Sequence, residues 1–399
     1  LDHDPFGRPG TLRPPDGAAH DITMTYLGSR ELQQTSMVAT APGTETAATR
    51  IHRQDRQGRL WQTVEPSSPD GTNVTTTVTY DVGGRTAKIE TVTFGLPPIT
   101  QSRTYTFDGR GFLLEETHPE KGASGNGSVF YDLYDPWGNV GRVTDGPSDL
   151  SFTYDALGRN TLVFDEAQGR AMVDYLYDGA AGRGEGKLWQ ATRHNWVDLP
   201  RTVGGVEDIE VTETYTYNGL AGLVSDYALD IQPQGYSFTQ GFDYDELGDL
   251  EDLYYPDCQH TGCPQDEPSR TVSHVWDQGF LTEVTGFVTS ITYHPNGLWD
   301  EIQHSNGVTS HLGLDPSGLA RPQWLTTTGA TDPASPPEPD PNLNLGPYTF
   351  DGSGNITGIA GESFLYDAIS RLVEGSAGGN TEQYQYDAFG NLTQVTRTY

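Results

Sequence analysis

The feature that most constrains the fold of this chain is a short motif that recurs along nearly its whole length. Its clearest copy is YQYDAFGNL at residues 384–392. Aromatic residues two positions apart lie on one face of a β-strand, an Asp after them accepts hydrogen bonds from a turn, and a Gly takes a positive φ without steric cost. The motif therefore predicts a strand, a tight turn and a second strand.

Copies of the motif share an aromatic residue followed by Asp, and most add a Gly and an Arg or Asn shortly afterwards. We interpret the defining residues as structural, because each has a role in the turn or the strand. They include Tyr80, Asp81, Tyr134, Asp135, Gly138, Tyr154, Asp155, Gly158, Arg159, Tyr244, Asp245, Gly248, Tyr366, Asp367, Tyr386, Asp387 and Gly390. Most neighbouring copies lie about two to three dozen residues apart, a spacing that indicates a stacked or spiral repeat architecture.

The composition favours strands over helices. Tyr, Phe, Trp, Val and Thr are frequent, Gly and Pro separate short segments, and no long stretch has apolar residues at helical spacing. We predict an all-β fold in which antiparallel hairpins stack into one continuous spiralling sheet, with residues 1–399 as a single array. Because both ends fall inside repeats, we expect a fragment of a longer polypeptide. Two irregular loops interrupt the array: 256–268, which contains both cysteines, and 331–347, which is rich in Pro.

The net charge limits the partners of the chain. Lys and Arg number 23 against 55 Asp and Glu, which gives a formal charge of −32. Such a surface repels phosphate backbones, so we expect no nucleic-acid partner, whereas a basic partner is easier to accommodate. The acidity has a simpler explanation too, since it keeps a large β-surface soluble. No apolar run reaches transmembrane length.

The motif resembles a known repeat. Tyr-Asp, two variable residues, Gly, Arg or Asn, and an apolar residue, matched closely around Tyr154, Tyr366 and Tyr386, look like the YD repeat of bacterial Rhs proteins. Similar repeats occur in the Tc-toxin C-subunit complex and in teneurins. The resemblance implies a long antiparallel sheet that spirals into part of a hollow shell, a toxin-like polypeptide cargo from the C-terminal part of the same full-length protein, and a secreted or cell-surface bacterial location.

One departure from that family concerns self-cleavage. Rhs cores typically end in an Asp-Pro-rich segment that plugs the shell and carries aspartates for cleavage before the toxin. The nearest stretch here, Asp315-Pro316-Ser317-Gly318, is followed by ordinary repeats and lacks the rest of that motif. We therefore give Asp315 no protease role.

The two cysteines are the most distinctive chemical feature. Cys258 and Cys263 flank a short segment with a central His260. A local disulfide suits an exported protein; free thiols and a metal site are the alternatives, although a structural zinc site needs four ligands and no second pair is evident. The acidic group around Asp243 and Asp252 lacks EF-hand spacing. With no His-Glu-x-x-His or Gly-x-Ser-x-Gly motif, we expect no catalytic residue, cofactor or metal.

Our leading interpretation is a structural, non-enzymatic shell segment that encloses or displays a polypeptide. A closed sheet leaves few free edges and shields its contents, and an acidic inner wall would favour a basic cargo. The alternative is an extracellular adhesion or carbohydrate-binding array, in which repeated aromatic rings contact cell-surface glycans. An enzyme with a site assembled from distant residues ranks below both. Open sheet edges also make self-association a possibility to test.

Overall fold

A computed structural model describes residues 2–66, 73–93, 97–121, 127–179, 183–198, 205–258, 270–329, 343–387 and 389–399. Within these ranges the regular elements are strands, apart from two short 3₁₀ helices, η1 (Ala18–His20) and η2 (Leu220–Gly222). None of the helices in the described part of the chain is long and apolar enough to cross a membrane. The prediction of an all-β fold is confirmed.

Most strands belong to one antiparallel sheet of 27 strands in which each strand pairs with the next along the chain. Its strands are β1 (Asp2–His3), β2 (Pro9–Leu12), β3 (Ile22–Leu27), β4 (Glu31–Ala41), β5 (Thr44–Gln54), β6 (Leu60–Pro66), β7 (Asn73–Tyr80), β8 (Thr86–Thr93), β9 (Thr100–Phe107), β10 (Leu113–His118), β11 (Gly127–Asp132), β12 (Arg142–Asp145), β13 (Ser148–Tyr154), β14 (Asn160–Asp165), β15 (Arg170–Tyr177), β16 (Leu188–Asp198), β17 (Val206–Thr216), β18 (Asp226–Gln232), β19 (Tyr236–Tyr244), β20 (Leu250–Cys258), β21 (Thr271–Asp277), β22 (Phe280–Val284), β23 (Val288–Tyr293), β24 (Trp299–His304), β25 (Thr309–Leu314), β26 (Pro322–Thr328) and β27 (Leu343–Leu345).

A second antiparallel sheet of six strands follows. The strands therefore form two sheets, whereas the sequence predicted one continuous sheet. Its strands are β28 (Tyr348–Phe350), β29 (Ile356–Ile359), β30 (Glu362–Tyr366), β31 (Leu372–Ala377), β32 (Asn380–Tyr386) and β33 (Leu392–Thr398). The break falls at Gly346 and Pro347. A Cβ on Gly346 would lie 2.4 Å from the Cβ of Trp324, and Pro347 has no N–H to donate to a neighbouring strand.

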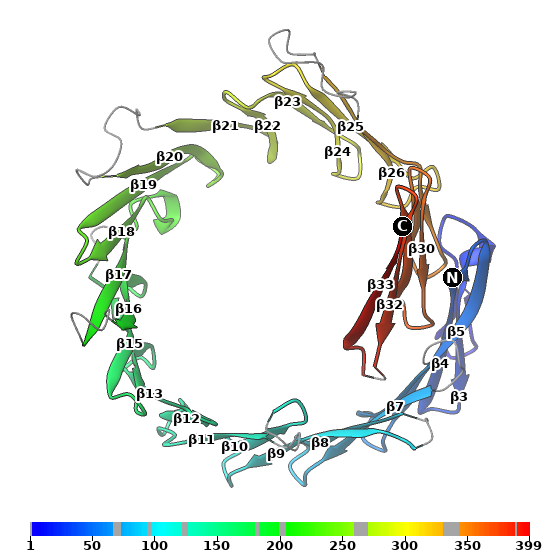
Figure 1. Cartoon of the computed structure of the whole chain (residues 1–399), viewed down its shortest axis with the longest axis horizontal. Coiled ribbons are helices and arrows are strands. Elements are labelled where there is room, and N and C mark those ends of the chain that lie inside the picture. Colours follow the sequence, from blue (N-terminus) through cyan, green and yellow to red (C-terminus); the bar gives the residue numbers. More distant parts are fainter. Residues whose placement is uncertain are drawn as a thin grey trace.

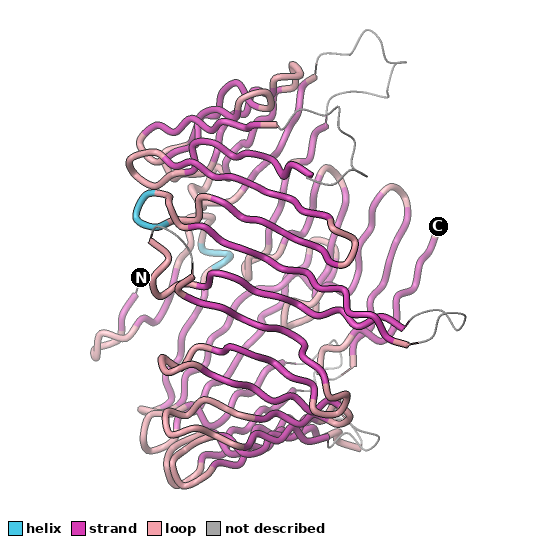
Figure 2. The backbone as a smooth tube through the Cα atoms, turned by 90° about the vertical axis from the view of Figure 1, so that its left-hand side faces the viewer, coloured by secondary structure: helices cyan, strands magenta, loops and turns pink. Residues whose placement is uncertain are grey.

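The strands curve around a hollow centre (Figure 1). The 27-stranded sheet follows most of a ring, and the strands run between its two rims (Figure 2). The C-terminal hairpins then lie inside the ring, against the N-terminal strands β3–β5 (Figure 1). The prediction of a spiralling sheet that forms part of a hollow shell is thus confirmed, with the chain ends overlapping in two layers.

The two rims carry different connections. In a meander, connections from odd to even strands fall on one edge, and the Asp turns after β5, β7, β13 and β19 are of this kind. The even-to-odd connections fall on the other edge and include both predicted insertions. Within the predicted insertions, β20 extends to Cys258 and β27 forms at 343–345, whereas residues 259–268 and 331–342 lie outside the described part of the chain.

The buried core of the described residues is small, as expected for a wall one sheet thick. Its most buried side chains are Val38 and Asp351, each 1% exposed, and Asp367 is 3% exposed. These lie where the C-terminal hairpins overlap the N-terminal strands. The densest packing therefore occurs at this overlap, which we call the seam.

Candidate functional site: repeat turns, inner face and seam

The turn at Asp155 shows why the motif needs its residue types. The Asp155 N–H donates to the Arg159 carbonyl at 3.0 Å, and the Gly158 N–H donates to the Asp155 carbonyl at 3.0 Å. The Asp155 Oδ1 accepts the backbone N–H groups of Leu157 and Arg159, while Oδ2 accepts Arg159 Nε at 2.7 Å. Gly158 has a φ of 77°, a value that favours glycine. One carboxylate thus accepts hydrogen bonds from two backbone N–H groups and one arginine side chain of the turn.

The other predicted turns repeat this arrangement with defined variations. Asp81 binds Arg85 in the same way, and Asp135 and Asp387 bind an Asn instead. Asp245 keeps only the backbone bonds, because Asp249 stands at the position of the Arg. At Asp367 the residue with positive φ is Ser370, at 67°.

The tyrosine of each motif connects its repeat to the preceding one. Its hydroxyl donates to the carbonyl of the apolar residue that ends the previous turn. The bonds are Tyr80 to Leu60 (2.5 Å), Tyr134 to Leu113 (2.7 Å), Tyr154 to Val140 (2.9 Å), Tyr244 to Val224 (2.9 Å), Tyr366 to Ile356 (2.7 Å) and Tyr386 to Leu372 (2.8 Å). Burial raises the pKa of Tyr134, Tyr244 and Tyr366, so these hydroxyls remain donors to a higher pH than exposed tyrosines do.

The arginine of a turn forms a second connection, towards the next repeat. The Arg159 guanidinium lies 4.4 Å from the centre of the Tyr177 ring, and Arg59 lies 4.0 Å from that of Tyr80. Such cation–π contacts add to the ion pair within the turn. Hydrogen bonds from the Arg159 backbone and then its guanidinium hold the pKa of Asp155 below its usual range. Neither inter-repeat link was predicted from the sequence, although the regular order of Arg and the following Tyr is visible in it.

The seam identifies which side chains face the hollow. A cavity of about 320 Å³ lies between the C-terminal hairpins and strands β6–β9, and its wall includes Val74, Thr76, Thr91 and Gln101. Since the C-terminal hairpins lie inside the ring (Figure 1), these four side chains point inward. Residues directly opposite one another on antiparallel strands share a face, so the strand register extends this assignment around the wall.

From β11 to β19 the inward face assigned in this way is mainly apolar and aromatic, although Asp145, Asp165 and Glu213 also lie on it. Register pairs connect Glu116 to Val129, Tyr131 to Val143, Val143 to Leu150, Phe152 to Val163, Val163 to Val173, Val173 to Arg193, Arg193 to Val211, Val211 to Ile231 and Ile231 to Tyr236. The opposite face of the same strands carries mostly Ser, Thr and acidic residues. The sequence alone did not reveal which face points inward.

Two acidic side chains on the inward face, Glu116 and Glu213, accept hydrogen bonds from tyrosines. Tyr131 donates to Glu116 at 2.6 Å, and Tyr215 donates to Glu213 at 2.7 Å. Burial together with the bond to Glu116 raises the pKa of Tyr131. Two acidic groups on this face are therefore tied to the wall, and the predicted acidic character of the inner wall is weaker than the net charge suggests.

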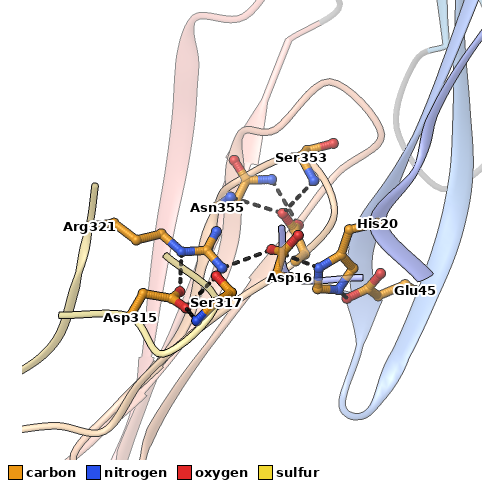
Figure 3. Close-up of polar contacts among 9 residues, drawn as sticks. Asp16, His20, Glu45, Asp315, Ser317, Arg321, Ser353 and Asn355 are labelled. Atoms are coloured by element: carbon orange, nitrogen blue, oxygen red, sulfur yellow. Dashed lines mark hydrogen bonds and ion pairs between the residues drawn. The ribbon is translucent and has the colours of Figure 1, made fainter. Parts of the chain in front are cut away.

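A polar network closes the seam at the rim of the Asp turns (Figure 3). Arg321 lies 2.5 Å from Asp315 of its own turn and 2.8 Å from Asp16 near the other end of the chain. Asp16 in turn lies 2.9 Å from His20 Nδ1. Burial alone would raise the pKa of Asp16, but His20 and Arg321 outweigh it and lower that pKa. Asp315 thus has a structural place at the seam.

Asp351 makes the deepest contact of the seam. Its Oδ1 accepts the N–H groups of Ser353 and Asn355, as the Asp155 carboxylate does in its own turn. Its Oδ2 also accepts the Ala39 N–H of β4 at 3.0 Å, so this repeat turn binds the first layer of the wall. Ser353 adds a bond of 2.9 Å to Ser36.

The cysteine pair is the remaining candidate from the sequence, and the structure adds a group of possible metal ligands. Cys258 ends β20 opposite Phe238, whereas Cys263 lies outside the described residues, so their disulfide stays a prediction. In the part of the chain that the structure describes, one group of side chains is close enough to hold a metal ion: His194, Asp208 and Glu210. The sequence around these three residues matches no metal-binding motif, so their spacing did not predict the group.

Comparison with known proteins identifies the repeat. Residues 366–399 match the family described as RHS Repeat. The chain carries an RHS repeat. The resemblance read from the Tyr-Asp motifs is thereby confirmed. A search of curated proteins found no match.

Solved structures similar to the chain include TcdB2-TccC3 without its hypervariable C-terminal region, at 13% identity and a TM-score of 0.42 over 92% of this chain. Another is TcdB2-TccC3-TEV, at 14% identity and 0.38 over 95%. A third is the Photorhabdus luminescens Tc holotoxin pore with the TccC3 substitution D651A, at 12% and 0.32 over 92%. This chain spans 26% of the length of each of the three.

Proposed function

We propose that this chain is a structural segment of a hollow β-shell that encloses a polypeptide, and that it has no enzymatic role. The observation that carries the proposal is the inward face of β11–β19, which bears mainly apolar and aromatic side chains. The strands that bear this face curve around a hollow centre (Figure 1). Extended apolar surface that faces neither a core nor a membrane usually marks an interaction site. A polypeptide with exposed apolar side chains is a suitable occupant.

The seam supports the enclosure. Asp351, Arg321 and Asp16 join segments that are more than 300 residues apart, and two of them are at least 89% buried as side chains. Because these contacts hold the overlapping ends of the wall together, the space inside is better enclosed than it would be behind a wall with free ends. A secreted or cell-surface location, and a cargo supplied by the C-terminal part of a longer protein, are part of the same proposal.

Photo-crosslinking tests where a polypeptide sits. Tyr175 lies on the inward face, because Val173 of the same strand is in the inward row, and its neighbour Leu176 points outward and is 48% exposed. Benzoylphenylalanine is placed at 175 or at 176, and the full chain is co-expressed with a polypeptide that does not fold alone. We expect crosslinks from position 175 and few from 176. Equal yields from both positions, or a higher yield from 176, would contradict enclosure.

A further inference from the structure

Three neighbouring strands gather one histidine and three carboxylates on the outward face. His194 of β16 lies opposite Glu210 of β17 in the register, and Asp208 is the next residue of β17 on that face. Asp174 of β15 reaches His194 from the other side. Arg193 and Val211, which point inward, lie on the opposite face of the same strands. This group is therefore separate from the hollow and from the seam.

The two nitrogens of His194 have different surroundings. Nε2 lies 2.7 Å from Asp174 Oδ2, and Nδ1 lies 2.5 Å from Asp208 Oδ2. A proton on Nε2, donated to Asp174, leaves the lone pair of Nδ1 directed towards Asp208 and Glu210. Metal-binding histidines are commonly oriented by this type of carboxylate partner. The His194 side chain is only 12% exposed, and Trp196 stacks beside it at 6.2 Å, so the ring has little freedom to turn away.

One carboxylate oxygen of Asp208 is available to bind a cation. Its Oδ1 is buried and has no hydrogen-bond partner among the described residues, and such an oxygen is costly unless a cation or donor reaches it. One ligand atom from each of His194, Asp208 and Glu210 lies within 4.8 Å of the others. Imidazole and carboxylate ligands suit zinc and related first-row ions, and three protein ligands leave a position for water.

We propose that His194, Asp208 and Glu210 bind a divalent transition-metal ion such as Zn²⁺, with Asp174 as the residue that positions His194. Without metal, the same geometry holds a protonated imidazole between two carboxylates. Binding of the ion therefore displaces the proton of His194 Nδ1 and replaces it with a link between β16 and β17. The ion would add a link between β16 and β17 towards the rim opposite the repeat turns.

Isothermal titration calorimetry of the full chain with ZnCl₂ at pH 7.5 tests the site. We expect one ion per chain for the unmodified protein and at least tenfold weaker binding for His194→Asn and Glu210→Gln. Glu210 is exposed, so its variant should fold normally. Asp174→Asn should weaken binding about 10- to 100-fold, as expected for an orienting partner. The control is His118→Asn, because His118 lies 3.3 Å from Glu116 and forms no ion pair with a second carboxylate within the described ranges.

Proton release gives a second readout. Repeating the titration in buffers of different ionisation enthalpy should show proton release on binding in the unmodified protein, because the ion replaces a proton on His194. The proposal is overturned if the unmodified chain binds no Zn²⁺, if His194→Asn and Glu210→Gln bind as tightly as it does, or if His118→Asn causes the same loss.

Discussion

Replacing Asp351 with Ala should loosen the seam more than the same change loosens an isolated repeat turn. The matched control is Asp135→Ala, because both carboxylates accept two backbone N–H groups and the side-chain amide of an Asn four residues on. Only Asp351 also accepts the N–H of Ala39, which is 7% exposed. The difference between the variants therefore isolates the contact between the two layers of the wall.

The size of the difference follows from that single bond. A buried N–H left without an acceptor costs about 1–3 kcal/mol. Since each 1.4 kcal/mol is roughly a factor of ten in an equilibrium constant, opening of β4 at the seam should become about 5- to 150-fold more frequent in Asp351→Ala than in Asp135→Ala. The turn bonds lost in both variants cancel in the comparison.

Hydrogen exchange measured by mass spectrometry reads this opening directly. Peptides that cover β4 (Glu31–Ala41) should exchange faster in Asp351→Ala, whereas in Asp135→Ala the increase should be confined to β11 and β12. The reasoning is refuted if β4 is equally protected in both variants, because the bond between Asp351 and Ala39 would then contribute nothing to joining the layers.

Four further predictions concern the turns. Tyr154→Phe removes the bond to Val140 and should lower the free energy of unfolding by about 0.5–1.5 kcal/mol in urea titrations; no change would argue against the inter-repeat link. Gly138→Ala should destabilise more than Gly58→Ala in the same assay, because both have positive φ but only at Gly138 would a Cβ meet the Phe112 ring, at 2.7 Å; equal losses would contradict this. The lowered pKa values of Asp81 and Asp155 mean that their stabilisation is present above the unfolded-state pKa of about 3.9 and is lost as pH falls through the lower folded-state values. Melting temperatures of a double Asn variant at these positions should therefore fall less steeply below pH 4 than those of the parent, and parallel curves would count against the claim. Trp137 is 78% exposed at a turn tip, so Trp137→Ser should reduce any self-association seen by sedimentation velocity; an unchanged distribution of species that includes oligomers would exclude this rim as the contact.

Much of the fold was predictable because the motif encodes local structure. Asp387 and Gly390 define a turn through contacts within a few residues, and such contacts can be predicted from their spacing. The sheet break at Gly346 and Pro347 was not predicted, because it depends on the close approach of Trp324, which only the folded chain reveals.

The seam and the outward histidine group could not be predicted from the sequence, because both depend on contacts between distant residues. Asp351 looks like any other turn aspartate, and its bond to Ala39 spans 312 positions. His194, Asp174 and Asp208 come from three different strands, and their meeting depends on a register that alternation alone does not fix. The direction of the apolar face likewise depends on which way the sheet curls.

The central claim, a hollow wall around a polypeptide, is tested most directly by cryo-electron microscopy of particles purified from the natural source, with mass spectrometry of the intact chain alongside. The account predicts a hollow body whose wall is one sheet thick, with density for a polypeptide against the inward face and a mass above 43.5 kDa. A solid rod or filament of this chain alone, with no interior space, would contradict it.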